Sequence, residues 1–106
     1  MTSSSRRVVR ATQEFFEDLD RQLGPDRGPS GEPSANDFHV ADLLRIVERF
    51  ATDFDSMPEL ITGRPDYRVL AGTGILVAGF LVVGHLASDG AVELIELDLD
   101  KRLGWE

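Results

Sequence analysis

Two stretches in the first half of the chain carry apolar residues at helical spacing. The stronger one predicts a helix over residues 37–55, capped by Asn36 or Asp37 and ended by Met57-Pro58. The weaker one follows Thr12, whose hydroxyl can cap a helix, and ends at Gly24-Pro25. We expect both apolar stripes to be buried: Phe15, Phe16, Leu19 and Leu23 in the first helix, and Val40, Leu43, Leu44, Val47, Phe50, Ala51 and Phe54 in the second.

In the second half of the chain, the apolar period shortens to two. This pattern predicts three antiparallel strands, at Asp66–Gly72, Ile75–Ala87 and Ala91–Asp100. A two-residue turn at Thr73-Gly74 would place Arg68 opposite Gly79. The alternation changes phase in the last strand, which predicts a β-bulge near Leu94 or Ile95.

A short apolar segment at Arg7–Thr12 is suited to a first strand, and the full order is then β-α-α-β-β-β. We therefore expect one two-layer α+β domain over residues 7–106, in which a helix pair packs on an antiparallel sheet. Residues 1–6 form a disordered tail in this interpretation, and the Gly/Pro-rich stretch 24–36 is an exposed loop.

The middle strand is apolar on both of its faces. Helices of this chain can cover only one face of the sheet, so the other needs a second source of cover. The candidates are the C-terminal stretch with Leu103 and Trp105, a second copy in a homodimer, or a different protein. This pattern favours a partner-binding protein.

Composition narrows the chemistry. The 106 residues contain no cysteine, which excludes disulfides, thiolate metal sites and a cysteine nucleophile. The net charge of −8 opposes non-specific binding to nucleic acids and anionic membranes. No metal-binding or cofactor-binding motif is present, so we expect neither a metal nor a cofactor.

Residues 69–88 contain no charged side chain, which is the usual sign of a membrane span. Four glycines and the Gly72-Thr73-Gly74 interruption favour two buried strands instead, and the span stays as a third alternative. The N-terminus lacks the apolar region of a secretion signal. We therefore expect a cytoplasmic protein.

Four side chains are candidates for chemistry. Arg64 and Arg68 flank Tyr67, and guanidinium groups can bind a phosphate; the alternative is structural pairing with an acid such as Asp66 or Asp100. His85 could exchange protons near neutral pH, or be held by a hydrogen bond at the rim of the sheet. With Arg68 opposite Gly79, His85 would lie about 20 Å from it, counting about 3.3 Å per residue.

Three strings resemble the RelE/ParE family of bacterial type II toxins, over about four-fifths of the chain. They are TQEFFEDL at residues 12–19, MPELITGRPDYRVL at 57–70, and LVV at 81–83 with VELI at 92–95. The resemblance implies the α+β fold, a cognate antitoxin as partner, and an arginine at Arg68 that contacts RNA or stabilises the sheet. Active members are usually basic and carry a histidine or aromatic residue near the C-terminus, whereas residues 98–106 contain neither His nor Tyr.

The leading interpretation is thus a toxin-like component of a type II toxin–antitoxin pair. If it is catalytic, the reaction is metal-independent RNA cleavage by Arg68, Arg64, His85 and Tyr67. The alternative is a non-catalytic protein-interaction module on the same fold.

Overall fold

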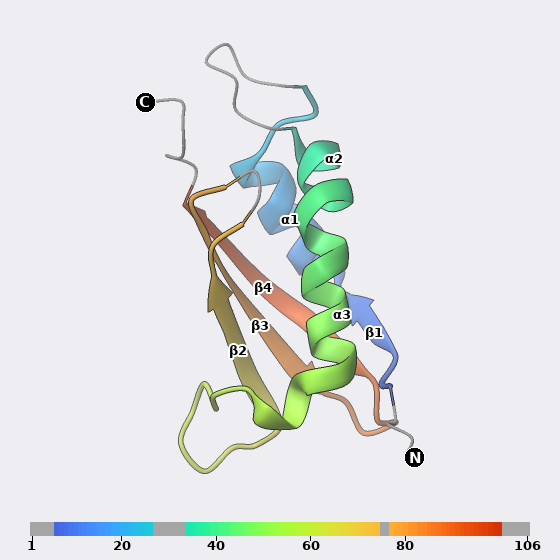
Figure 1. Cartoon of the computed structure of the whole chain (residues 1–106). Helices are drawn as coiled ribbons and strands as arrows, with labels where there is room; N and C mark the ends of the chain where they lie inside the picture. The colour runs from blue at the N-terminus through green and yellow to red at the C-terminus, as the bar shows by residue number, and fades with distance from the viewer. Residues whose placement is uncertain (1–5, 27–33, 75–76, 101–106) are drawn as a thin grey trace.

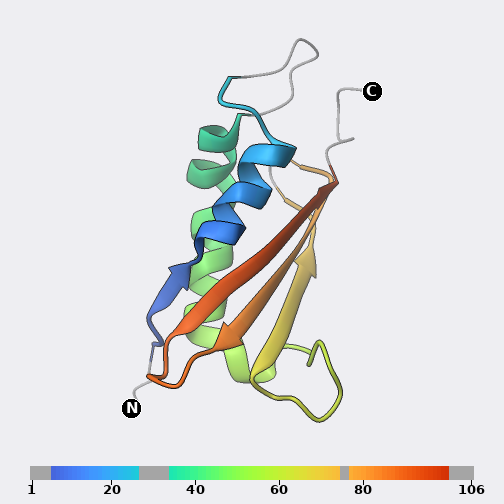
Figure 2. The same cartoon turned by 180° about the vertical axis from the view of Figure 1, so that it is seen from behind.

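The protein has two layers, a four-stranded sheet and a set of helices on one of its sides (Figures 1 and 2). The computed structural model describes residues 6–26, 34–74 and 77–100. The strands lie in the order β1-β4-β3-β2. This arrangement confirms the expected α+β fold, with helices packed on a sheet.

The sheet is mixed rather than fully antiparallel. Strands β2 (Tyr67–Gly72), β3 (Gly79–Leu86) and β4 (Val92–Asp100) form the expected antiparallel meander. The short β1 (Val9–Ala11), however, runs parallel to β4, with Val9 opposite Val92. Local patterns could not show this direction, because it depends on how the chain comes back beside β1 after 80 intervening residues.

Helix α1 (Gln13–Gln22) begins as expected, since the Thr12 hydroxyl accepts a hydrogen bond from the Phe15 amide. Phe15, Leu19 and Leu23 are buried. The expectation that Phe16 joins them is wrong: its side chain is 40% exposed. Positions four apart hold one face of the helix toward the core, and Phe16 lies one residue, about 100°, away from it.

Helix α1 also closes the outer edge of β4 where β1 ends. The Asp18 carboxylate accepts from the Leu97 amide at 3.2 Å. The Gln22 amide group donates to the Leu97 carbonyl and accepts from the Leu99 amide, both at 2.7 Å. These side chains take the place of a neighbouring strand and satisfy backbone groups that an edge strand would otherwise expose.

The second helical stretch is longer than expected and is not purely α-helical. It consists of α2 (Ala35–Phe38), a π turn η1 (His39–Leu43), α3 (Leu44–Asp53) and a 3₁₀ turn η2 (Phe54–Ser56). Its cap is Ser34, in a capping box with Asp37, rather than Asn36 or Asp37.

The π turn changes which side chains of this stretch face the core. Val40 and Leu44 were expected in the buried stripe, but they are 63% and 56% exposed. A π turn adds a residue to one turn of the helix and so shifts the phase of the stripe. The buried positions around it are Phe38, Asp42, Leu43, Ile46, Phe50, Ala51 and Phe54.

The register of β2 and β3 differs from the expected one. Strand β3 starts at Gly79, so the connection is longer than a two-residue turn, and Arg68 lies opposite Gly84. Tyr67 lies opposite His85, which removes the expected 20 Å separation of His85 from the arginine end. The bulge is confirmed, because Val83 pairs with Glu96 and Gly84 with Leu94, leaving Ile95 as the extra residue.

Some expectations fall on residues outside the description. These are the tail at 1–5, the centre of the Gly/Pro-rich loop at 27–33, and the C-terminal stretch with Leu103 and Trp105. Arg6 is described, and its guanidinium pairs with Glu48. The described parts of residues 69–86 lie in β2, in β3 and in the connection between them, and residues 87–88 follow β3. None of the described helices has the length and apolarity needed to cross a membrane.

The two layers approach each other closely at Gly84, which lies under Phe50. A Cβ atom on Gly84 would lie 2.5 Å from Cε1 of Phe50 and 3.1 Å from Cγ1 of Val92. Phe50 and Val92 are fully buried and cannot move aside easily. The helical layer therefore needs a residue without a side chain at this position.

We expect Gly84→Ala to lower the free energy of unfolding by about 1–3 kcal/mol, because the methyl group overpacks the core. Gly79→Ala is the matched control in the same strand, since its Cβ would lie no closer than 3.5 Å to any atom. Urea denaturation of both variants measures the difference. Equal stability of the two variants would contradict this view of the layer contact.

Candidate functional site

Three of the four candidate side chains come together at one end of the sheet. Tyr67 and His85 are cross-strand neighbours, with ring centroids 4.5 Å apart and ring planes tilted by 31°. The Arg64 guanidinium carbon lies 5.0 Å from the centroid of the Tyr67 ring. These residues are on the side of the sheet opposite the helices, because their strand neighbours Leu70 and Val82 face the core.

Asp66 joins this group. Its carboxylate accepts from Nε of Arg64 at 3.1 Å and from Nη2 at 2.9 Å, and Oδ2 lies 3.5 Å from Nε2 of His85. The hydrogen bond from Arg64 lowers the pKa of Asp66, and the same pair raises the pKa of Arg64. Asp66 is therefore ionised at neutral pH, and its carboxylate accepts hydrogen bonds from Arg64 while lying close to the imidazole of His85.

The sequence suggested Asp66 as an acid that could pair with Arg64 or Arg68. In the structure it pairs with Arg64. Its contact with His85 depends on the register of β2 and β3, so no local pattern in the sequence indicates it. An imidazole beside a carboxylate is a common arrangement for proton transfer. The four residues Arg64, Asp66, Tyr67 and His85 form what we call the histidine cluster.

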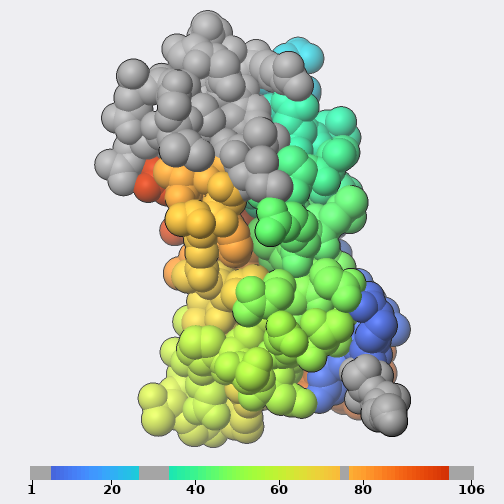
Figure 3. Space-filling view, in the orientation of Figure 1, coloured from blue at the N-terminus to red at the C-terminus, as the bar shows by residue number. Residues whose placement is uncertain are grey.

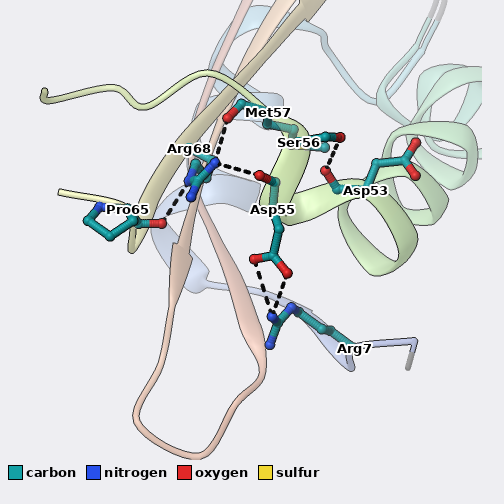
Figure 4. Close-up of polar contacts among 7 residues, drawn as sticks. All are labelled: Arg7, Asp53, Asp55, Ser56, Met57, Pro65 and Arg68. Carbon is teal, nitrogen blue, oxygen red and sulfur yellow. Dashed lines mark hydrogen bonds and ion pairs between the residues drawn. The ribbon is translucent and has the colours of Figure 1, made fainter. Parts of the chain in front are cut away.

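Arg68 lies apart from this cluster, on the helical side of β2. Its Nε donates to the Pro65 carbonyl at 2.7 Å, and its Nη1 donates to the carbonyls of Asp55 at 3.0 Å and Met57 at 2.7 Å (Figure 4). Its guanidinium carbon is 5.6 Å from the centroid of the buried Phe54 ring. Arg68 thus has a structural role, but its partners are backbone carbonyls and not the acid, Asp66 or Asp100, that the sequence suggested.

Asp55 links Arg68 to the N-terminus. Its carbonyl accepts from Arg68, while its carboxylate accepts from Nη2 of Arg7 at 3.1 and 3.3 Å (Figure 4). The two arginines thus hold the end of the helical stretch between the first residues of the domain and β2. We conclude that the Arg68 contacts fasten the helical layer to the sheet.

The histidine cluster is one end of a larger surface, which we call the second face. It consists of the side chains of β2, β3 and β4 that point away from the helices. In each cross-strand row, β2 and β3 contribute apolar or aromatic residues and β4 contributes an acid. The rows are Tyr67, His85 and Glu93; Val69, Val83 and Glu96; Ala71, Leu81 and Asp98; and, at the far end, Gly79 and Asp100.

Exposure along the second face is uneven. Val83 is only 2% exposed, whereas Leu81 is 36% exposed and Ala71 is also exposed. Glu93 pairs with Arg10 of β1 at 3.2 Å. Glu96 and Asp98 are exposed, and neither has an ion pair or hydrogen bond of its side chain to the residues described here. This face is therefore partly apolar and carries uncompensated negative charge.

A cavity lies elsewhere, between α3 and the end of β2 (Figure 3). It has a volume of about 620 Å³ and an apolar floor that includes Ile46, Leu70 and Phe80. Arg45 and Arg49 stand at its rim. Arg49 pairs with Asp53 at 2.9 Å, whereas the exposed Arg45 has no acid or carbonyl partner in the described part of the chain.

We also asked whether the described side chains could together hold a metal ion. No three His, Asp or Glu side chains among residues 6–26, 34–74 and 77–100 are grouped so that they could hold a metal ion. The chemistry that these residues offer is therefore that of the histidine cluster, the second face and the α3–β2 cavity.

Comparison with known proteins identified no relative of this chain. No protein-family model matches the chain, and neither the curated proteins nor the solved structures contain a significant match.

We expect Arg68→Ala to lower the free energy of unfolding by about 1–3 kcal/mol, because three carbonyl oxygens lose a charged donor. Arg64→Ala removes an exposed guanidinium and should cost clearly less. Urea denaturation of the two variants provides the comparison. If Arg64→Ala were as destabilising as Arg68→Ala, the distinction between a structural and an exposed arginine would be wrong.

Proposed function

We propose that this protein is a toxin-like component of a bacterial type II toxin–antitoxin pair. In this proposal, the second face is the surface that binds the cognate antitoxin. The observation that carries the proposal is the exposure of Ala71 and Leu81 on that face. The helices cover only the opposite side of the sheet. A sheet with apolar residues on both sides is normally covered on both.

Two further features support the toxin-like interpretation. The element order β-α-α-β-β-β, on which the resemblance to RelE/ParE toxins depends, is the order that the chain adopts. Both edges near the core are also partly closed: Asp18 and Gln22 bond to β4, and Pro58 and Leu60 bond to the start of β2. The sheet edges therefore have fewer unpaired N–H and C=O groups to which a partner strand could bind, which leaves the second face as the available binding surface.

This proposal predicts that induced expression of the protein arrests growth of a bacterial host, and that co-expression of a short open reading frame adjacent to its gene restores growth. The two purified products should form a complex whose dissociation constant rises at least about tenfold in Leu81→Arg. Leu44→Arg is the control, because Leu44 is exposed on the helical layer instead. Calorimetric titration measures the affinities.

Normal growth under induction, together with no complex between the two products, would refute the toxin-like interpretation. A complex that is weakened equally by Leu81→Arg and Leu44→Arg would place the interface away from the second face.

A second candidate function is metal-independent RNA cleavage at the histidine cluster. The observation that favours it is the contact of His85 with Asp66, beside Arg64 and Tyr67. In this reaction His85 would take the proton of a ribose 2′-hydroxyl, whose oxygen attacks the phosphorus as the P–O5′ bond breaks and water protonates the leaving 5′-oxygen. Asp66 would stabilise the imidazolium, and Arg64 would bind the phosphate. The acids on the same face oppose RNA binding, so antitoxin binding remains the leading proposal.

If the second candidate is correct, the purified protein cleaves RNA in the presence of a chelator. His85→Ala should lower the rate by about 10² to 10⁴, the usual contribution of a general base, while Arg45→Ala in the distant cavity should not. Gel analysis of end-labelled RNA, free and on translating ribosomes, measures both rates. Absence of cleavage by the wild type would leave the non-catalytic interaction module.

A further inference from the structure

We infer that the second face binds a basic amphipathic helix of the partner protein. This inference rests on the proposed function, because it specifies the partner of the same face. It begins from the rows of the sheet, in which every β4 position that faces away from the helices is an acid. Glu93, Glu96, Asp98 and Asp100 border a strip of apolar residues from β2 and β3.

Charge decides the class of partner. The chain carries a net charge of −8, and neither Glu96 nor Asp98 makes an ion pair with the described residues. Arg21 lines a hollow together with these two acids but pairs with Asp18. RNA and anionic lipid surfaces would be repelled by this strip. A second copy of the chain would bring an equally acidic molecule against it. A surface with lysine or arginine side chains beside apolar ones is complementary in both respects.

Backbone chemistry decides the form of the bound segment. The N–H and C=O groups of strands in the middle of a sheet are used in the ladder and do not point out of its face. An extended segment lying on this face would leave its own backbone groups unpaired, whereas a helix satisfies them internally. An amphipathic helix can then place one apolar stripe on the sheet.

The spacing of the charges fits such a helix. Acids two residues apart on β4, such as Glu96 and Asp98, are about 6.6 Å apart along the strand. Basic residues at positions i and i+4 of a helix are separated by about 6 Å along its axis. A helix aligned with β4 can therefore pair a basic side chain with each exposed acid while its leucines contact Ala71 and Leu81.

The surface also has room for these contacts. A shallow hollow of about 310 Å³ lies at the Gly79 end of the sheet. Its lining includes Ala71, Leu81, Asp98 and Asp100 of the second face, together with Gly72, Phe80 and Leu99 of the helical side. A lysine or arginine of the partner can lay its aliphatic stem on this apolar floor and bring its charge to Asp98. Gly79 keeps the hollow open because it has no side chain.

The experiment uses two fluorescently labelled synthetic peptides of about 18 residues, long enough to form a helix. Both carry one leucine stripe, flanked by lysines in the first peptide and by glutamates in the second. Fluorescence anisotropy with the full chain should give binding of the lysine peptide that weakens with added salt. The glutamate peptide should bind at least about tenfold more weakly.

Two double variants separate the second face from the overall charge. Glu96→Lys with Asp98→Lys should weaken binding of the lysine peptide at least about tenfold. Glu14→Lys with Asp20→Lys makes the same charge change on the exposed side of α1 and should leave the affinity within about threefold. Leu81→Asn should also weaken binding, although it leaves the charge unchanged. Circular dichroism checks that each variant is folded.

Equal binding of the two peptides, or equal loss in the two double variants, would overturn the inference. So would dimerisation in sedimentation experiments that is abolished by Leu81→Asn, because a second copy would then cover the face. A growth-arresting protein whose antitoxin binds regardless of Glu96 and Asp98 would refute this inference alone. Selective peptide binding without growth arrest would instead refute the proposed function.

Discussion

The β-bulge at Ile95 is the constraint on which the arrangement of both faces depends. Before the bulge, Val92 and Leu94 point into the core, and after it Leu97 does so. If β4 alternated regularly through Ile95 instead of bulging there, every side chain beyond Ile95 would change sides. Leu97 would then leave the core and Glu96 and Asp98 would enter it, where unpaired charges are very costly. The bulge thus buries the leucines and collects the acids on the second face.

The contacts between the helical layer and the sheet fix the position of one relative to the other. Phe50 packs directly on Gly84, so a side chain at that position would push the layers apart. Arg68 bonds to the carbonyls of Asp55, Met57 and Pro65, and so fixes the end of the helical stretch against β2. Because Arg68 turns toward the helices, its sequence neighbour Tyr67 must turn the other way. Alternation along a strand therefore separates a structural arginine from the histidine cluster.

Much of the fold follows from local patterns in the sequence. The Thr12 cap, the alternation of the last three strands and the bulge all have local causes, namely a hydroxyl next to free amides and a period of two that changes phase. The pattern was less informative about the second helical stretch. There the π turn exposes Val40 and Leu44 and buries Asp42, because its extra residue shifts the phase that a regular α-helix would keep.

By itself, the sequence determined the α+β class, the order of the elements and the acidic character, because these depend on composition and on neighbours within a few residues. The candidate residues Arg64, Tyr67 and His85 could also be chosen from it by their chemistry. Only the tertiary structure decided that Arg64 and His85 meet at Asp66 and both lie against the Tyr67 ring. It also decided that Arg68 faces the other way and that β1 lies parallel to β4. Strand register and direction depend on pairing between residues that are far apart in the chain. A shift of the register by one residue moves every side chain of the strand to the other face of the sheet.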